Sequence, residues 1–285
     1  MGSLNQYSSI VAAHALKPCR ILFAHGSQLD FGELNSRGRQ CSCVAMYFLA
    51  AAELSQNLSS WISDDLTKIL EAGTEFYESV DQKWKDANGF VDVEGLQGEI
   101  NVEQGILQME IPDVDHGVLS SARALAGVME VLQEALERVV TQSSTFIIVT
   151  NSYSLGLYVE NGFAYIFNSH SCGLLGDSAA TGNACVIQIE LAEAAKFVSS
   201  YIENNYGSRV NLSHVNLHHH TFCIYRVKFT NGKSHILAIQ LRDSRLLPRI
   251  INIYCFFVGN AVNHKDDSMR PKMTTPGLSL GNSLW

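Results

Sequence analysis

The sequence predicts an α+β fold in which a helix-rich first half packs on a mostly antiparallel sheet. Apolar residues at helical spacing are prominent between residues 41 and 140, whereas runs rich in β-branched and aromatic residues dominate after residue 145. Two Asn-Gly dipeptides lie between such runs and predict tight hairpins, which join antiparallel neighbours.

The expected elements follow in chain order. Helical spacing of apolar residues predicts helices over residues 41–58, 63–85, 119–140 and 191–205. Strands are predicted over residues 20–24, 145–150, 155–160, 163–168, 184–189, 222–230, 235–241 and 250–258. Residues 87–112 contain four glycines and scattered acidic residues without a period, which fits either a long loop or two short strands.

The hairpin turns are expected at Asn161-Gly162 and at Asn231-Gly232-Lys233. The polar composition of both chain ends predicts a flexible N-terminus over residues 1–18 and a flexible tail over residues 263–285. One main domain, residues 19–262, is expected between them.

The size and charge of the chain limit its class. With 285 residues, 46% hydrophobic content and a mean hydropathy of +0.04, the chain can bury a substantial core. Its 28 acidic and 20 basic side chains give a net charge of -8, which opposes binding to a phosphate backbone. Nucleic acid is therefore not an expected partner, whereas a basic protein surface would suit the charge.

The cysteines and apolar segments indicate an intracellular protein. The seven cysteines have only one close pair and no repeated spacing, so they do not form a disulfide framework. The N-terminus lacks the basic flank of a secretory signal. The longest apolar run, residues 250–262, is shorter than the roughly 20 residues of a membrane helix. We expect no membrane association and a reducing compartment, the cytosol or nucleus, including those of a host cell.

Cys41 is the candidate nucleophile. It follows Gly38-Arg39-Gln40 and opens directly into the apolar run that begins at Val44. The N-terminus of a helix lowers the pKa of a thiol and offers backbone N–H groups to a developing oxyanion. Cys43 would lie roughly 200° around the helix axis and face the core. Taken alone, a cysteine at a helix start is more often a small buried apolar residue.

Asn168 and His170 are the candidate base and its partner. They end the second strand of the first predicted hairpin, and the period of two places both on the face of Ala164 and Ile166. A Cys/His site needs an imidazole that a second polar side chain holds at one angle and in one tautomer. One strand end can supply both side chains.

A metal site is the less favoured interpretation of the polar clusters. His218-His219-His220 with Cys223, and Cys41 with Cys43, contain residue types that bind metals. Consecutive histidines alternate between the faces of a strand, and the spacing lacks the paired Cys-x-x-Cys ligands of structural zinc. We therefore expect neither a metal nor another cofactor.

The spacing of Gln28, Gln40-Cys41 and Asn168-Ser169-His170 resembles that of a known family, the deubiquitinase domain of herpesvirus large tegument proteins and its tegument-like relatives. Members carry a glutamine after a strand, then Gly-x-Gln-Cys at a helix start, with the glutamine thirteen positions before the cysteine. The same separation joins Gln28 to Cys41. A later strand of the family ends in aromatic-Asp-x-His, which matches the segment from Phe167 to His170 with Asn168 in place of the Asp.

The resemblance implies a papain-like cysteine protease that hydrolyses the bond after the C-terminal glycine of ubiquitin through a thioester. It assigns the nucleophile to Cys41, as a thiolate paired with the His170 imidazolium, and an oxyanion donor to Gln28. Asn168 takes the third position, with Asp177 as the alternative. Ubiquitin or polyubiquitin is the implied partner.

Two other functions stay open at the level of the sequence. A papain-like protease, deamidase or acyltransferase that acts on another substrate would use the same Cys and His. A ubiquitin-binding module with little catalysis would fit the Asn at position 168, which stabilises an imidazolium less than a carboxylate does.

Overall fold

The computed structural model describes residues 18–55, 57–119, 129–151, 153–206 and 220–231. All of them fall within one compact unit, residues 1–232. The predicted strands at 235–241 and 250–258, the hairpin at Asn231-Gly232-Lys233 and the predicted flexible termini lie wholly or mostly outside the described residues.

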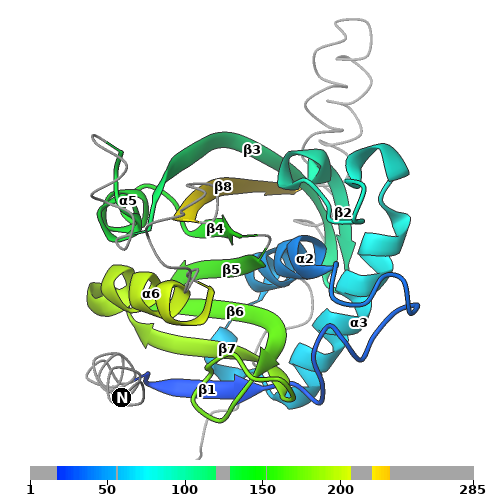
Figure 1. Ribbon diagram of the computed structural model, residues 1–285, viewed down its shortest axis with the longest axis horizontal. Coiled ribbons are helices and arrows are strands. Elements are labelled where there is room, and N and C mark those ends of the chain that lie inside the picture. The colour runs from blue at the N-terminus through cyan, green and yellow to red at the C-terminus, as the bar shows by residue number, and fades with distance from the viewer. Residues whose placement is uncertain (1–17, 56, 120–128, 152, 207–219, 232–285) are drawn as a thin grey trace, which may run out of the picture. The chain divides into compact units, whose positions relative to one another are not determined.

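The described unit is built on one sheet whose strands lie in the order β1-β7-β6-β5-β4-β8-β3-β2 (Figure 1), with antiparallel pairing throughout. The strands are β1 (Arg20–Phe23), β2 (Gly98–Val102), β3 (Gly105–Val118), β4 (Thr145–Thr150), β5 (Tyr153–Glu160), β6 (Phe163–Cys172), β7 (Asn183–Glu190) and β8 (Thr221–Asn231). The α-helices are α2 (Cys41–Leu54), α3 (Ser63–Ser79), α5 (Leu132–Val139) and α6 (Leu191–Tyr206). Three short 3-10 helices are η1 (Leu58–Ser60), η2 (Gln82–Trp84) and η3 (Val93–Leu96).

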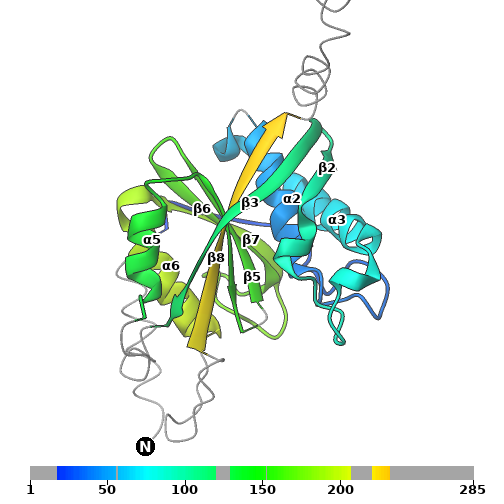
Figure 2. The same cartoon turned by 90° about the horizontal axis from the view of Figure 1, so that it is seen from above.

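Helices cover both faces of the sheet. Figure 2 shows α2 and α3 on one face, which we call the α2 face, and α5 and α6 on the other, which we call the α6 face. Each face has its own apolar core, one centred on α2 and the other on α5 and α6. Alternate residues of β6 enter the two cores: Tyr165 and Phe167 enter the first, and Ala164 and Ile166 enter the second. The predicted alternation along this strand is confirmed.

Helix α2 is almost wholly buried because small residues let it approach its neighbours. A side chain at Gly73 of α3 would meet the Val44 backbone at 2.7 Å, and one at Gly156 of β5 would meet the Phe48 ring at 3.0 Å. The ring of Phe48 also stacks on Phe167 of β6, with centroids 4.7 Å apart. These contacts fix the start of α2 against β5 and β6.

The hairpin predicted at Asn161-Gly162 is confirmed. Asn161 and Gly162 have φ values of 51° and 81°, the left-handed conformation that a two-residue hairpin requires. The turn pairs Glu160 with Phe163 and sets the register of β5 against β6. That register in turn decides which residue of β5 lies beside His170.

Two predicted segments differ from the structure. Residues 87–112 contain η3 and β2 and enter β3, a longer strand than expected. Pro112 argues against a strand in the sequence, because proline lacks the N–H of a regular ladder. In the structure a bulge between Glu110 and Asp113 accommodates the proline. The helix predicted over residues 119–140 is wrong at residues 129–131, since Val131 bridges Val118 and α5 begins at Leu132; residues 120–128 lie outside the described residues.

Within the part of the chain that the structure describes, no helix is long and apolar enough to cross a membrane.

Candidate active site

The side chain of Gln40 shapes the loop that delivers Cys41 to the start of α2. It is fully buried, its Oε1 accepts the Gly38 N–H at 3.1 Å, and its Nε2 donates to the Phe31 carbonyl at 3.0 Å. Its own carbonyl accepts the N–H of Val44, which begins the helical hydrogen bonds. The loop between β1 and α2 is therefore closed on itself, and Cys41 is the first helical residue.

The Cys41 thiol lies against β5. Only 1% of the residue is exposed, and Ser154 and Ser42 both hydrogen-bond the thiol. The two serine hydroxyls are also 2.9 Å apart, so β5 and the first turn of α2 are joined here. Burial raises the pKa of Cys41 more than these hydrogen bonds lower it.

Cys43 points away from this site, as the sequence predicts. It belongs to the core of the α2 face, and none of its surface is exposed. Burial strongly raises the pKa of its thiol, which makes it an inert apolar residue.

Gln28 is held from two directions by a single residue of β6. The Gln28 N–H donates to the Ser169 carbonyl at 2.8 Å, and the Ser169 hydroxyl donates to Gln28 Oε1 at 2.9 Å. The carbonyl end of the amide is thereby fixed. Among the described residues its Nε2 has no hydrogen-bond acceptor, so the N–H groups of this end are available.

His170 and Asn168 form the predicted pair. The ring Nδ1 of His170 is 2.8 Å from Asn168 Oδ1, which also accepts the backbone N–H of His170 at 3.0 Å. Because Oδ1 can only accept, Nδ1 carries the proton and Nε2 keeps its lone pair. A neutral imidazole in this tautomer can take a proton through Nε2.

Two tyrosines of α6 complete this pair and were not identified from the sequence. Asn168 Nδ2 donates to the Tyr201 hydroxyl at 2.8 Å and to the Tyr206 hydroxyl. Both tyrosines belong to the buried stripe of α6. This buried position could have identified them from the sequence, because a phenol on the buried face of a helix needs a polar partner.

The nucleophile and the base flank the start of β5. Cys41 is hydrogen-bonded to Ser154, while the ring of the preceding residue, Tyr153, lies 4.8 Å from the His170 ring. Cys41 approaches from the α2 face, and His170 lies on the α6 face, where its ring is 5.9 Å from that of Tyr206. Cys41 and His170, which are 129 positions apart in the chain, therefore both lie beside the start of β5.

Burial favours the neutral forms of both groups. Desolvation lowers the pKa of His170 to about 4, and the same effect raises that of Cys41. The thiolate and imidazolium pair expected from the resemblance is therefore not the favoured form of the unliganded site. A thiol beside a neutral imidazole is favoured instead, so the proton must move as the thiol reacts.

Asp177 lies outside this network. It is exposed in the loop between β6 and β7, where its carbonyl accepts the Gly173 N–H at 2.7 Å and its carboxylate lies beside Gly173. The atom facing His170 Nδ1 is Asn168 Oδ1, so the geometry favours Asn168 over Asp177 for the third position.

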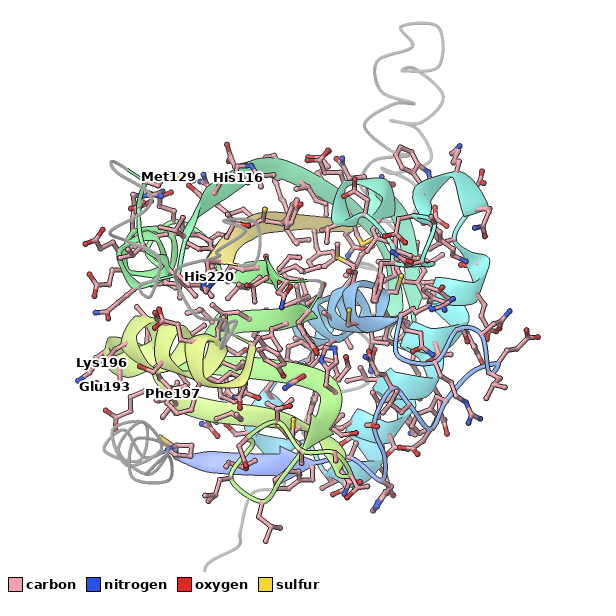
Figure 3. All side chains as sticks on the ribbon, in the orientation of Figure 1. His116, Met129, Glu193, Lys196, Phe197 and His220 are labelled. Atoms are coloured by element: carbon pink, nitrogen blue, oxygen red, sulfur yellow. The ribbon has the colours of Figure 1, made fainter. Side chains whose placement is uncertain are left out.

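The histidines and cysteines considered as metal ligands are dispersed. His218 and His219 lie outside the described residues, and His220 is buried immediately before β8. Cys223 is 3.1 Å from His116 on the neighbouring strand; Figure 3 labels His116 and His220. Among the residues that the structure describes, no group of three or more His, Cys, Asp or Glu side chains is placed to hold a metal ion.

Comparisons with known proteins cover this whole region. No curated protein sequence matches the chain. A solved structure with the same fold is the ubiquitin-specific protease encoded by a tegument protein of murine cytomegalovirus, in complex with a ubiquitin-based suicide substrate. It aligns with a TM-score of 0.56 and 16% identity over 74% of this chain and 87% of the viral one.

The family comparison includes the candidate site. The model of the N-terminal conserved region of herpesvirus tegument proteins matches residues 25–231, which is more than half of the chain. The matched range holds Gln28, Cys41, Asn168 and His170. The chain therefore belongs to the family of the herpesvirus tegument protein N-terminal conserved region.

Proposed function

We propose that this chain is a cysteine deubiquitinase, which hydrolyses the bond after the C-terminal glycine of ubiquitin through a thioester. The observation that carries the proposal is the hydrogen bond from His170 Nδ1 to Asn168 Oδ1, which leaves Nε2 as a base beside the start of β5. The family and the shared fold with a viral ubiquitin-specific protease support ubiquitin as the substrate. The seven cysteines lack the repeated spacing of a disulfide framework, which supports a reducing, intracellular setting.

The first chemical step starts from neutral partners. As the Cys41 sulfur attacks the glycine carbonyl, its proton passes to His170 Nε2 beside the start of β5. The imidazolium that forms is oriented by Asn168 through Nδ1. The low pKa of His170 makes it a weak base but a strong acid, which favours rapid return of the proton to the leaving lysine amine.

The negative oxygen of the tetrahedral intermediate needs donors that are already in place. The Nε2 of Gln28 supplies one, because Ser169 fixes its Oε1 and leaves the N–H groups of the other end available. The backbone N–H of Cys41 at the helix start supplies a second. A donor of this kind stabilises a transition state by about 3 kcal/mol. Water then hydrolyses the thioester, with His170 accepting the water proton.

A covalent probe tests the proposal. Ubiquitin that carries a C-terminal electrophile should form an adduct with the full chain, and Cys41→Ala should abolish that adduct. Cys43→Ala is the matched control, because Cys43 is two residues away and faces the core. This control should retain the adduct, although it lowers the free energy of unfolding by removing buried sulfur.

Parallel reactions separate the two other functions. Related modifiers with the same electrophile, and short peptide amides, report a papain-like enzyme for a different substrate. Tight ubiquitin binding without adduct or turnover would indicate a binding module. An adduct that survives Cys41→Ala would overturn the assignment of the nucleophile.

A further inference from the structure

The amide of Asn168 creates an ambiguity that a carboxylate would not. Both oxygens of an aspartate accept hydrogen bonds, whereas an asparagine has one accepting end and one donating end. If Asn168 Nδ2 faced the ring, His170 Nδ1 would have to accept, and the ring proton would move to Nε2. Nε2 could then take no proton from Cys41. The side-chain amide of an Asn in this position must therefore be prevented from rotating by about 180°.

The donating end of Asn168 is held by two phenols. Nδ2 donates to Tyr201 at 2.8 Å and to Tyr206, so both of its N–H groups have acceptors. Asn168 has no exposed surface, and the two tyrosines are 6% and 4% exposed. Water therefore does not compete for these hydrogen bonds.

Backbone groups fix the direction of the hydrogen bonds at both ends of the network. The Tyr201 hydroxyl donates its only proton to the Gly176 carbonyl at 2.7 Å, which leaves its oxygen as an acceptor toward Asn168. At the other end, the His170 backbone N–H can only donate, and it does so to Oδ1 at 3.0 Å. A reversed amide would place donor against donor at His170 and acceptor against acceptor at Tyr201.

We propose that Tyr201 and Tyr206 are positioning residues that hold the Asn168 amide in one orientation and so keep the base nitrogen of His170 unprotonated. The catalytic consequence rests on the deubiquitinase proposed above, but the tautomer of His170 does not. A symmetric carboxylate presents an acceptor to His170 Nδ1 in either orientation. In this arrangement the two phenols hold the asparagine in the one orientation that does so.

The chemistry of the phenols suits this role. Burial raises the pKa of both hydroxyls, so they are neutral near neutral pH. The Tyr206 ring also packs 4.4 Å from the ring of Tyr153. Replacement of either tyrosine by phenylalanine keeps such ring contacts and removes only the hydroxyl, which at Tyr201 also donates to the Gly176 carbonyl. Tyr→Phe is therefore the appropriate substitution.

The first experiment compares the tyrosines in two backgrounds. With Asn168 present, the double variant Y201F/Y206F should lower kcat for ubiquitin amide hydrolysis about 10- to 100-fold, with little change in KM. In the N168D background, the same pair should lower kcat by less than about threefold, because either carboxylate oxygen can accept from Nδ1. A purely structural role would give equal losses in both backgrounds.

The second experiment reads the tautomer directly and requires no substrate. In the full chain labelled with ¹⁵N-histidine, H170Q identifies the His170 signals among those of the ten histidines. The unsubstituted protein should carry the ring proton on Nδ1. Y201F/Y206F should move it wholly or partly to Nε2, and N168D combined with Y201F/Y206F should return it to Nδ1. Y201F and Y206F alone, with thermal unfolding as the check of folding, serve if the pair does not fold.

The two experiments fail in different ways. If ubiquitin is not the substrate, every variant is inactive while the tautomer still shifts, so the inference stands and the proposed function falls. A proton on Nε2 in the unsubstituted protein would overturn the inference. So would a tautomer that Y201F/Y206F, or Y201F and Y206F singly, leave unchanged in the folded protein.

Discussion

The α2 face and the α6 face hold their halves of the site in opposite ways. On the α2 face, Gln28 is fixed through its carbonyl end alone, and its donating end is left available. On the α6 face, the Asn168 amide is hydrogen-bonded at both ends and fully buried. A group that must bind a passing oxyanion keeps spare donors, whereas a group that only orients another side chain has none.

The largest expected effect comes from the base itself. H170Q should lower kcat about 10²- to 10⁴-fold, because the thiol then loses its proton acceptor. Steady-state hydrolysis of a ubiquitin amide measures this, and the adduct rate with the covalent probe should fall with it. The control is His116→Gln, a histidine on β3 away from the start of β5, which should keep its activity. Equal losses in both variants would indicate that His170 is not the base.

Gln28 should have the next largest effect. Gln28→Ala should lower kcat about 10²- to 10³-fold with little change in ubiquitin affinity, because the donor acts on charge that develops only in the transition state. Q28E keeps the shape of the side chain and lacks the donating end, so it should show a loss of similar size. If Q28E matched the unsubstituted protein, the oxyanion role would have to be given up.

The buried base should also make stability depend on pH. The unfolded chain binds a proton at His170 near its ordinary pKa of 6.5, whereas the folded chain binds it only near 4. This contribution to stability is therefore complete above pH 6.5 and is lost as the pH falls toward 4. Denaturant unfolding should show the unsubstituted protein losing about 2 to 3 kcal/mol more than H170Q across this range. Parallel pH curves for the two proteins would contradict it.

The smallest effect is expected where one serine orients Gln28. Ser169→Ala removes the hydroxyl that fixes Gln28 Oε1 and should lower kcat about tenfold. Ser171→Ala is the matched control, since Ser171 lies on the same face of β6 but donates to Ser27 instead. The kcat ratio of these two variants measures how far the free end of Gln28 depends on its fixed end.

Local signals were sufficient for the elements that carry the site. Gly38 to Cys41, the Asn161-Gly162 turn and the alternation through Asn168 and His170 are all patterns within a few residues, and the structure has the helix start, the hairpin and the strand face that they predict. The separate segments could be joined only through the family resemblance. The full length of β3 was not predicted, because proline disfavours a regular strand. In the structure, pairing with β8 through a bulge outweighs the local preference of Pro112.

Long-range contacts and burial were not readable from the sequence. The partners of Asn168 lie 33 and 38 positions further along the chain, and no local pattern connects them. The thiolate expected for Cys41 was inferred from the helix terminus and from the family resemblance. Burial of the thiol against Ser154 opposes it, and burial depends on the packing of the whole domain.

Four consecutive residues of β6 point alternately to the two sides of the sheet. Asn168 and His170 face α6, whereas Ser169 and Ser171 bond to Gln28 and Ser27 of the loop after β1. Deleting or inserting one residue within this stretch would exchange the two sets and direct the histidine toward the loop. Related sequences should therefore vary in length in the loop between β6 and β7 but not here, and this spacing is a sharper criterion for active relatives than overall identity.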